Sequence, residues 1–236
     1  MPPHSAENNG VILAVSGLNV SYGESKVLFD ITMSVQPRQI VACVGRNGAG
    51  KSTLLKSIAG FLKPSSGSVS ADHTDLAGRK PYDIAKLGIK YVPQDKKVFS
   101  DLTVRENLEL GSYATKDYNW DRVTDYFPKL KELMDRKAGF LSGGERQMLM
   151  IGRSLLGSPK VLLIDEPTEG LAPSIVSHLR NVFTELSKNT ALVIVEQNLP
   201  LVCAICSKVY AIKEGRIVAE LADPDTIKTD VCERYL

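Results

Sequence analysis

The chain begins with alternating apolar and polar residues and continues with short, wholly apolar runs. Alternation rich in β-branched residues predicts strands at 11–20 and 27–35, with a turn around Tyr22 between them. Unbroken apolar runs are typical of strands buried on both faces of a sheet. These runs lie at 40–44, 161–164 and 191–195, and further strands are expected at 68–71 and 89–92.

Apolar residues at helical spacing separate the buried-type strands. The expected helices are 51–61, 81–87, 143–156 and 173–186. Strands that alternate with helices predict a mainly parallel sheet covered by helices, which is an α/β fold. After the last apolar run, we expect another helix and a closing hairpin near Glu214 and Gly215.

Residues 95–139 interrupt this alternation. Charged and aromatic residues become frequent there, and short helical patterns at 104–110 and 121–127 replace the rhythm of strand and helix. We interpret the segment as an inserted helical lobe. The first ten residues are interpreted as a polar leader, and 223–236 as a short tail.

The composition agrees with one substantial folded domain. The chain has 236 residues, of which 43% are hydrophobic and 24% charged, and its formal net charge is +2. Such a chain can bury a core and is not disordered, and its balanced charge argues against nucleic acid as a partner. No stretch reaches the ~20 mostly apolar residues of a membrane-spanning helix, and the leader has no secretory-signal pattern. We therefore expect a cytoplasmic location.

The four cysteines do not indicate a disulfide framework in a chain of this length. Cys203 and Cys206 form a C-x-x-C pattern, which can mark a metal or redox site. Neither a second such pair nor a His pair accompanies it, and its surroundings are apolar. We interpret both as small buried side chains on a helix.

The segment 45–52 matches the pattern G-x-x-x-x-G-K-S and lies between an apolar strand and a helix, which is the context that this phosphate-binding motif requires. Its glycines let backbone N–H groups approach an anion, and the helix N-terminus adds its dipole. Lys51 would reach the outer phosphates, and the Ser52 hydroxyl could bind Mg²⁺. The predicted nucleotide-binding residues here are Gly45, Asn47, Gly48, Ala49, Gly50, Lys51, Ser52 and Thr53.

The apolar run at 161–164 ends in two carboxylates, Asp165 and Glu166. In phosphate-loop enzymes an acidic residue at such a strand end serves the metal, which assigns Asp165 to Mg²⁺. Glu166 could then orient or deprotonate the attacking water. The alternative is that the pair only caps a helix before Pro167.

The motif LSGGERQ at 141–147 places a serine and two glycines at a helix start, which is a second anion-binding N-terminus. Two separate phosphate-binding helix starts in one chain suggest a nucleotide clamped between two copies of the domain. The residues expected to face the nucleotide are Ser142, Gly143 and Gly144.

LSGGERQ, followed by LLIDEPTEGL at 162–171, resembles the ATP-binding cassette (ABC) ATPases, and the resemblance covers 11–222. It implies a P-loop NTPase of ABC type, in which a mainly parallel core sheet is joined by an N-terminal antiparallel β subdomain and the helical lobe. The ATP-binding core would be 11–94 and 140–222, and the lobe 95–139, its LSGG-bearing end reaching about residue 156.

The resemblance also implies roles for individual residues. Tyr22 would stack on adenine, and Gln94 would reach Mg²⁺ and the attacking water. The residues implied at the site are Glu166, Gln197 and Lys51 for catalysis, and Ser52, Gln94 and Asp165 for Mg²⁺.

Two positions depart from the wider family. Gln197 stands where a histidine is usual, and Ala172 stands where a carboxylate is usual. A glutamine can hydrogen-bond the γ-phosphate but cannot become a charged imidazolium. Together with YVPQDKKVFSDLTVRENL and DEPTEGLAPSIV, the sequence VEQN resembles the ATPases of branched-chain amino acid and urea or amide importers, where glutamine at this position is usual. Gln94 and TEGLAPS favour the urea or amide branch.

The resemblance implies an energy-coupling ATPase on the cytoplasmic face of the membrane, which uses ATP and Mg²⁺ and never touches the solute. Its partners would be a second cassette, paired head to tail, and permease subunits that dock near Phe99 and Leu102. Exposed apolar residues on a lobe are typical of such a docking surface. The alternatives are an exporter subunit, which Gln197 disfavours, and a soluble ABC protein of translation or DNA repair, which the length and charge disfavour.

Overall fold

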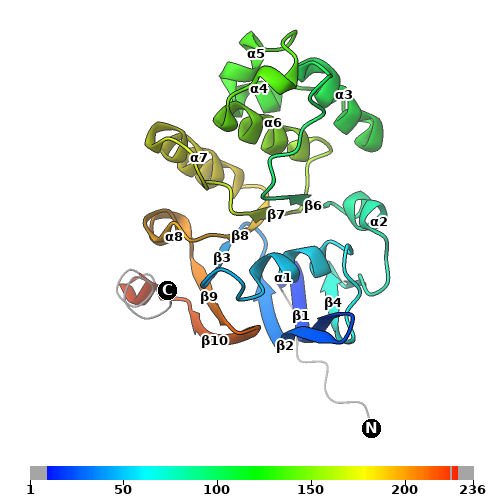
Figure 1. Cartoon of the computed structure of the whole chain (residues 1–236), viewed down its shortest axis with the longest axis vertical. Helices are drawn as coiled ribbons and strands as arrows, with labels where there is room; N and C mark the ends of the chain where they lie inside the picture. Colours follow the sequence, from blue (N-terminus) through cyan, green and yellow to red (C-terminus); the bar gives the residue numbers. More distant parts are fainter. Residues whose placement is uncertain (1–9, 224, 228–236) are drawn as a thin grey trace.

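The structure, a computed structural model, describes residues 10–223 and 225–227. The expected leader and tail therefore lie almost entirely outside the described residues, as does Cys232. Two sheets and the helices around them form the lower part of the molecule in Figure 1, and a group of helices forms the upper part. No helix within the described residues is both long and apolar enough to cross a membrane.

A four-stranded antiparallel sheet has the order β2-β1-β4-β5. Its strands are β1 (Leu13–Tyr22), β2 (Ser25–Val35), β4 (Ser66–Ala71) and β5 (Thr74–Asp75). Buried residues alternate with more exposed ones along β1, as the sequence pattern predicts. Tyr22 is the last residue of β1 and pairs with Ser25 of β2, so the turn itself is shorter than expected.

A six-stranded sheet has the order β10-β9-β3-β8-β7-β6, and every neighbouring pair is parallel except β9 and β10. This confirms the α/β fold with a mainly parallel core sheet and an N-terminal antiparallel part. The strands are β3 (Ile40–Val44), β6 (Ile89–Val92), β7 (Val161–Asp165), β8 (Ala191–Val195), β9 (Lys208–Lys213) and β10 (Arg216–Leu221).

Alternate residues of the core strands enter different apolar clusters, because successive side chains point to opposite faces. Val193 of β8 packs into the cluster that contains α1 (Lys51–Ile58) and the antiparallel sheet, whereas Leu192 packs with α6 (Gly143–Leu155) and α7 (Pro173–Leu186). The core sheet therefore lies between these two layers. Helix α1 ends before the expected residue 61, because Gly60 adopts a left-handed conformation with φ 79°.

The upper part of Figure 1 contains α3 (Val104–Thr115), α4 (Asp121–Tyr126), α5 (Pro128–Glu132) and α6, with a 3₁₀ turn at Ala138–Phe140. These elements fall in and directly after the segment interpreted as an inserted lobe. Helix α3 is longer than the pattern at 104–110 indicated. Trp120, the one tryptophan of the chain, precedes α4 and donates its indole N–H to Ser112 Oγ of α3 at 3.0 Å.

The segment that connects β6 to the lobe is held by one buried side chain, Asn107 of α3. Its Oδ1 accepts the Phe99 backbone N–H at 3.0 Å, and its Nδ2 donates to the carbonyls of Phe99 and Thr103 at 3.0 and 2.9 Å. Thr103 in turn caps α3 in a capping box with Glu106. The connection is thereby fixed to the helix that follows it.

The remaining elements are α2 (Pro81–Lys86) and α8 (Leu199–Ile205). Cys203 lies on α8, whereas Cys206 follows its last residue, so only one of the two cysteines is on a helix. Both pack against an apolar cluster, and the Cys203 thiol donates to the Ile227 carbonyl at 3.5 Å. Within the described part of the chain, no group of three or more His, Cys, Asp or Glu side chains could hold a metal ion.

Candidate functional site

The loop between β3 and α1 forms the floor of the site. Gly45 follows β3 with φ 151°, and a Cβ there would lie 2.1 Å from the Ile212 carbonyl oxygen, so only glycine fits. Gly50 precedes α1 with φ 102°, and no side chain caps the helix start. The N–H groups at the start of α1 are therefore left for an anion.

Lys51, the first residue of α1, points back into this loop. It is only 4% exposed, and its Nζ donates to the carbonyls of Gly45 and Arg46 at 2.7 and 3.0 Å. The same Nζ lies 3.8 Å from Glu166 Oε1. The amine is thus held inside the loop at the level where a phosphate chain would lie.

Ser52 and Asp165 face each other across the site, with Oγ and Oδ1 3.0 Å apart. The Tyr91 hydroxyl of β6 donates to the other carboxylate oxygen, Oδ2, at 3.0 Å. Burial raises the pKa of the Asp165 carboxyl, and the hydrogen bonds from Ser52 and Tyr91 offset only part of that effect. A cation beside Asp165 would favour its ionised form. A hydroxyl and a carboxylate oxygen are ligands that Mg²⁺ accepts, so these residues fit that ion.

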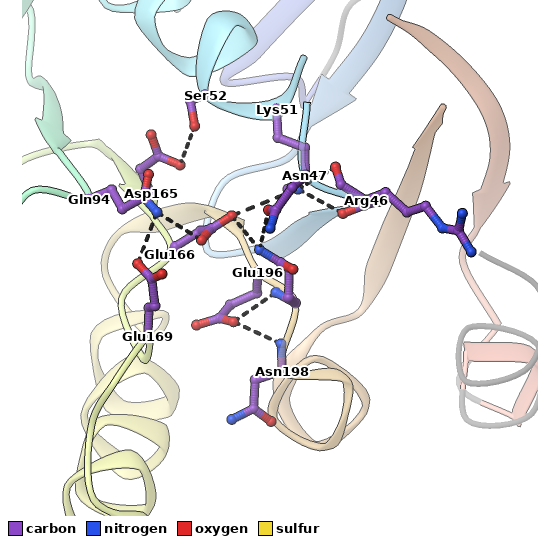
Figure 2. Close-up of polar contacts among 12 residues, drawn as sticks. Arg46, Asn47, Lys51, Ser52, Gln94, Asp165, Glu166, Glu169, Glu196 and Asn198 are labelled. Carbon is purple, nitrogen blue, oxygen red and sulfur yellow. Dashed lines mark hydrogen bonds and ion pairs between the residues drawn. The ribbon is translucent and has the colours of Figure 1, made fainter. Parts of the chain in front are cut away.

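Glu166 is the point at which three segments meet. Besides the Lys51 contact, its Oε2 accepts from Gln94 Nε2 at 3.0 Å, and its Oε1 accepts from Gln197 Nε2 at 2.8 Å. Figure 2 shows Glu166 between Lys51 and Gln94, with both side chains pointing toward it. Its backbone is left-handed, with φ 45°, which is a strained conformation for a residue with a side chain.

Gln94 and Gln197 each make a second contact that spans the site. Gln94 Nε2 also donates to Glu169 Oε2 at 2.9 Å, and the Lys96 ammonium donates to the backbone carbonyl of Glu169. Gln197 Nε2 also donates to Asn47 Oδ1 at 2.8 Å, which ties the segment after β8 to the phosphate loop.

Glu196 is a buried residue that the sequence interpretation did not single out. Its carboxylate accepts the backbone N–H groups of Thr168, Gln197 and Asn198 at 2.9 to 3.0 Å, and the Thr168 hydroxyl at 2.6 Å. It therefore locks the loop after β7 to the loop after β8 and orients Gln197. The available signal was its position directly after a buried strand, which it shares with Glu166.

A pocket of about 340 Å³ opens over this floor. Among the residues predicted to bind nucleotide or metal, it is lined by Asn47, Gly48, Gly50, Lys51, Ser52, Thr53, Gln94 and Glu166. Tyr22 does not line it, and its side chain is 47% exposed. Its stacking on adenine stays a prediction.

Ser142, Gly143 and Gly144 do not line the pocket either. Ser142 caps α6 in a capping box with Glu145, and Ser142 and Gly143 are exposed. In Figure 1 their helix, α6, belongs to the upper group of helices, while α1 belongs to the lower part. One chain therefore carries the two anion-binding helix starts apart from each other.

The site combines a helix start, a buried ammonium and two consecutive buried carboxylates at the end of β7. Such a set can hold a phosphate chain through backbone amides and Lys51, and a hard cation through Ser52 and Asp165. Glu166 is placed to accept a proton from a molecule in the pocket.

Comparison with known sequences identifies the family of the chain. The sequence model of the ABC transporter family matches residues 28–169. The chain is 40% identical over 212 residues to the high-affinity branched-chain amino acid transport ATP-binding protein BraG of Pseudomonas aeruginosa, an alignment that covers 88% of this chain and 91% of that protein. It is 30% identical over 226 residues to the lipopolysaccharide export system ATP-binding protein LptB of Haemophilus influenzae, covering 93% of each.

The fold has solved counterparts. A crystal structure of a nucleotide-free ATP-binding cassette from an ABC transporter superimposes with a TM-score of 0.85 at 30% identity, covering 95% of this chain and 96% of that one. The likeness extends over both sheets and the lobe, because nearly the whole of each chain is aligned.

Proposed function

Because this chain belongs to the ABC transporter family of ATPases, we propose that it powers an importer of branched-chain amino acids or of short amides such as urea. The observation that carries the catalytic part is the convergence of Lys51, Gln94 and Gln197 on the Glu166 carboxylate. These side chains come from α1, the segment after β6 and the segment after β8. They meet at Glu166, which lines the pocket. Such a carboxylate is placed to act on a water that attacks bound ATP.

The chemistry follows from the positions of these groups. The N–H groups of the phosphate loop and the Lys51 ammonium bind the β- and γ-phosphates, and Gln94 and Gln197 orient a water beside Glu166. Glu166 accepts a proton as the water oxygen forms a bond to the γ-phosphorus and the bond to the bridging oxygen of ADP breaks. Ser52 and Asp165 would hold Mg²⁺, and the ion would supply positive charge that neutralises the phosphates. The products are ADP and inorganic phosphate.

A second cassette completes the site in this proposal. The exposed start of α6, with Ser142 and Gly143, has no nucleotide-binding partner in its own chain, because the pocket is lined by other segments. In a head-to-tail pair, it would face the γ-phosphate bound to the other copy. This arrangement would make nucleotide binding close the pair and hydrolysis open it.

Import rather than export is supported by two observations. Identity is higher to the branched-chain amino acid transport protein BraG, at 40%, than to the export protein LptB, at 30%. Gln197, which is usual in the importer group, takes part in the site through Glu166 and Asn47. In this proposal the chain sits on the cytoplasmic face of the membrane, and permease subunits dock near Phe99 and Leu102. Phe99 is 53% exposed, as a docking residue should be.

The test of the catalytic proposal is Glu166→Gln. The amide keeps the shape of the side chain but cannot accept the proton, so turnover should fall by at least ~100-fold while ATP binding persists. Glu185→Gln is the matched control, because Glu185 is an exposed residue of α7 paired with Lys188. Measurements are steady-state ATPase activity and nucleotide affinity. Rapid turnover by Glu166→Gln would remove Glu166 as the base.

The solute is tested on the assembled transporter. Proteoliposomes that contain the permease subunits, this chain and the solute-binding protein are assayed for ATP-driven uptake of labelled leucine and of labelled urea. Uptake of either one, lost on Glu166→Gln, supports the importer. ATP-dependent release with no uptake would favour export.

A further inference from the structure

A second pocket, of about 190 Å³, lies where β6 meets the helices of the lobe. Its wall includes Lys90 and Tyr91 of β6, Gly111 and Ala114 of α3, and Met150 and Arg153 of α6. This volume is below the ~300–1,000 Å³ that is typical of small-molecule sites. It is suited to a single inserted side chain.

Two cations line this pocket without an anionic partner. Burial alone lowers the pKa of the Lys90 ammonium and of the Arg153 guanidinium. No ion pair within residues 10–223 and 225–227 involves either side chain. Arg153 Nη1 is buried and has no hydrogen-bond partner. Removing charged groups from water in this way is costly unless an opposite charge joins them.

Exposed apolar side chains surround the pocket on the lobe. The Arg153 guanidinium carbon lies 5.4 Å from the centre of the Phe99 ring. Leu110 and Tyr113 of α3 are exposed, and each is followed directly by a pocket residue, Gly111 and Ala114. A buried positive charge within an exposed apolar surface is the pattern of an interface that recognises one acidic side chain.

We propose that this pocket receives the carboxylate of an aspartate or glutamate on the cytoplasmic segment of a permease subunit, with Arg153 and Lys90 as the cations that bind it. The inference rests on the proposed docking of a permease near Phe99 and assigns the partner's chemistry at that place. Tyr91 lines the same pocket and donates its hydroxyl to Asp165, so the bound carboxylate would lie one side chain away from the residue that we assign to Mg²⁺.

The experiment uses the whole transporter, purified through a tag on a permease subunit, and measures how much of this chain stays bound. Arg153→Met keeps the aliphatic stem and removes the charge. Loss of one partner of a buried charge pair should weaken retention by at least ~30-fold. Lys97→Met is the control, because Lys97 lies near Phe99 on the segment between β6 and α3, but its side chain is 82% exposed and pairs with Asp95.

Two further measurements separate recognition from a structural role. The isolated Arg153→Met chain should bind ATP normally and melt at the same or a higher temperature, because an unpaired buried charge has been removed. Charge reversal, Arg153→Asp, should be rescued by a Lys at the matching acidic position of the permease. Normal retention of Arg153→Met, or its loss together with a lower melting temperature and no rescue, would overturn the proposal.

Phe99→Asp separates the test of permease docking near Phe99 from the test of carboxylate binding in the pocket. If it releases the chain while Arg153→Met does not, docking near Phe99 stands and the carboxylate proposal is wrong. If neither variant releases the chain, the docking position itself is wrong. Release by both, with rescue of Arg153→Asp, supports both.

Discussion

At the residue scale, the side chain of Asp165 at the end of β7 has two conflicting requirements, because it is buried in the fold and must still be available to a ligand. Its pKa is raised above the ordinary value of 3.8 by burial, although Ser52 and Tyr91 hydrogen-bond to it. Ionising Asp165 in the nucleotide-free protein therefore costs more free energy than ionising it in the unfolded chain.

This leads to a prediction for Asp165→Asn. Between pH 3.8 and the raised pKa, the folded state binds more protons than the unfolded state, so the free energy of unfolding falls as pH rises through this range. The asparagine side chain does not ionise, so the variant keeps the free energy of unfolding that the wild type loses. It should therefore melt a few degrees higher at neutral pH, at about 2–4 °C per kcal/mol for a chain of this size. The advantage should shrink on acidification.

The measurement is thermal unfolding of both proteins without nucleotide from neutral to acidic pH. Mg²⁺ with ATP should then stabilise the wild type more than the variant, because only the wild type offers a carboxylate beside the Ser52 hydroxyl. A melting-temperature difference that does not change with pH would contradict the assignment of the raised pKa.

How far single residues could be predicted depended on whether a local pattern marked them. Lys51, Ser52 and Glu166 stand in short motifs, and the structure brings them to one pocket. Glu196 lies in the sequence VEQN, but this motif does not indicate its role, because its three backbone contacts come from two loops that approach only in the fold. Likewise, the hydrogen bond from Tyr91 to Asp165 depends on the pairing of β6 with β7, which sequence patterns do not specify.

At the element scale, the connection from β6 to α3 is held by a buried amide as well as by backbone hydrogen bonds from residues 138–139. Asn107 is fully buried and satisfies the backbone of Phe99 on both its N–H and its carbonyl. A leucine of similar size would leave these groups unpaired in the interior.

Asn107→Leu should therefore destabilise the protein by about 1–3 kcal/mol. The backbone of 99–103 should also become accessible to solvent, because its anchor is lost. Hydrogen exchange of the amides in that segment measures the local effect, and chemical denaturation measures the global one. Exchange as slow as in the wild type would mean that the surrounding packing, rather than the amide, fixes the connection. Asn119→Leu, at an exposed lobe position, serves as the control.

The helices and strands were largely predictable because their hydrophobic residues follow clear patterns along the chain. The core strands are almost uninterrupted apolar runs, and the structure places them at the expected positions within one residue. The ends of helices were less predictable. Gly60 stops α1 early through its left-handed backbone, and α3 continues to Thr115 beyond its last strongly periodic residue. The two-residue strand β5 is too short to produce any pattern.

At the scale of the whole molecule, the separation of the two anion-binding helix starts predicts how activity depends on concentration. If each ATP site needs the start of α6 from a second copy, the ATPase rate per chain of the isolated protein should rise with protein concentration and level off when the pair is saturated. A rate per chain that stays constant on strong dilution would indicate that one chain hydrolyses ATP alone.

Mixing two inactive variants sharpens this prediction. Lys51→Ala damages the phosphate loop, and Gly143→Asp places a carboxylate at the start of α6, where a new side chain meets nothing within 4 Å. In a head-to-tail pair of one copy each, one site has both halves damaged and the other has neither. Activity should therefore return on mixing, up to about half the wild-type value per pair in the absence of cooperativity between the sites.

The position of Trp120 has a practical consequence. As the one tryptophan of the chain, it lies in the lobe, with its indole N–H bound to Ser112, and the core sheets contain none. Fluorescence excited selectively at tryptophan therefore reports on the lobe alone. The unlabelled protein carries its own optical reporter, and the colour, lifetime and anisotropy of its emission can follow lobe movement or permease docking in real time, without a dye.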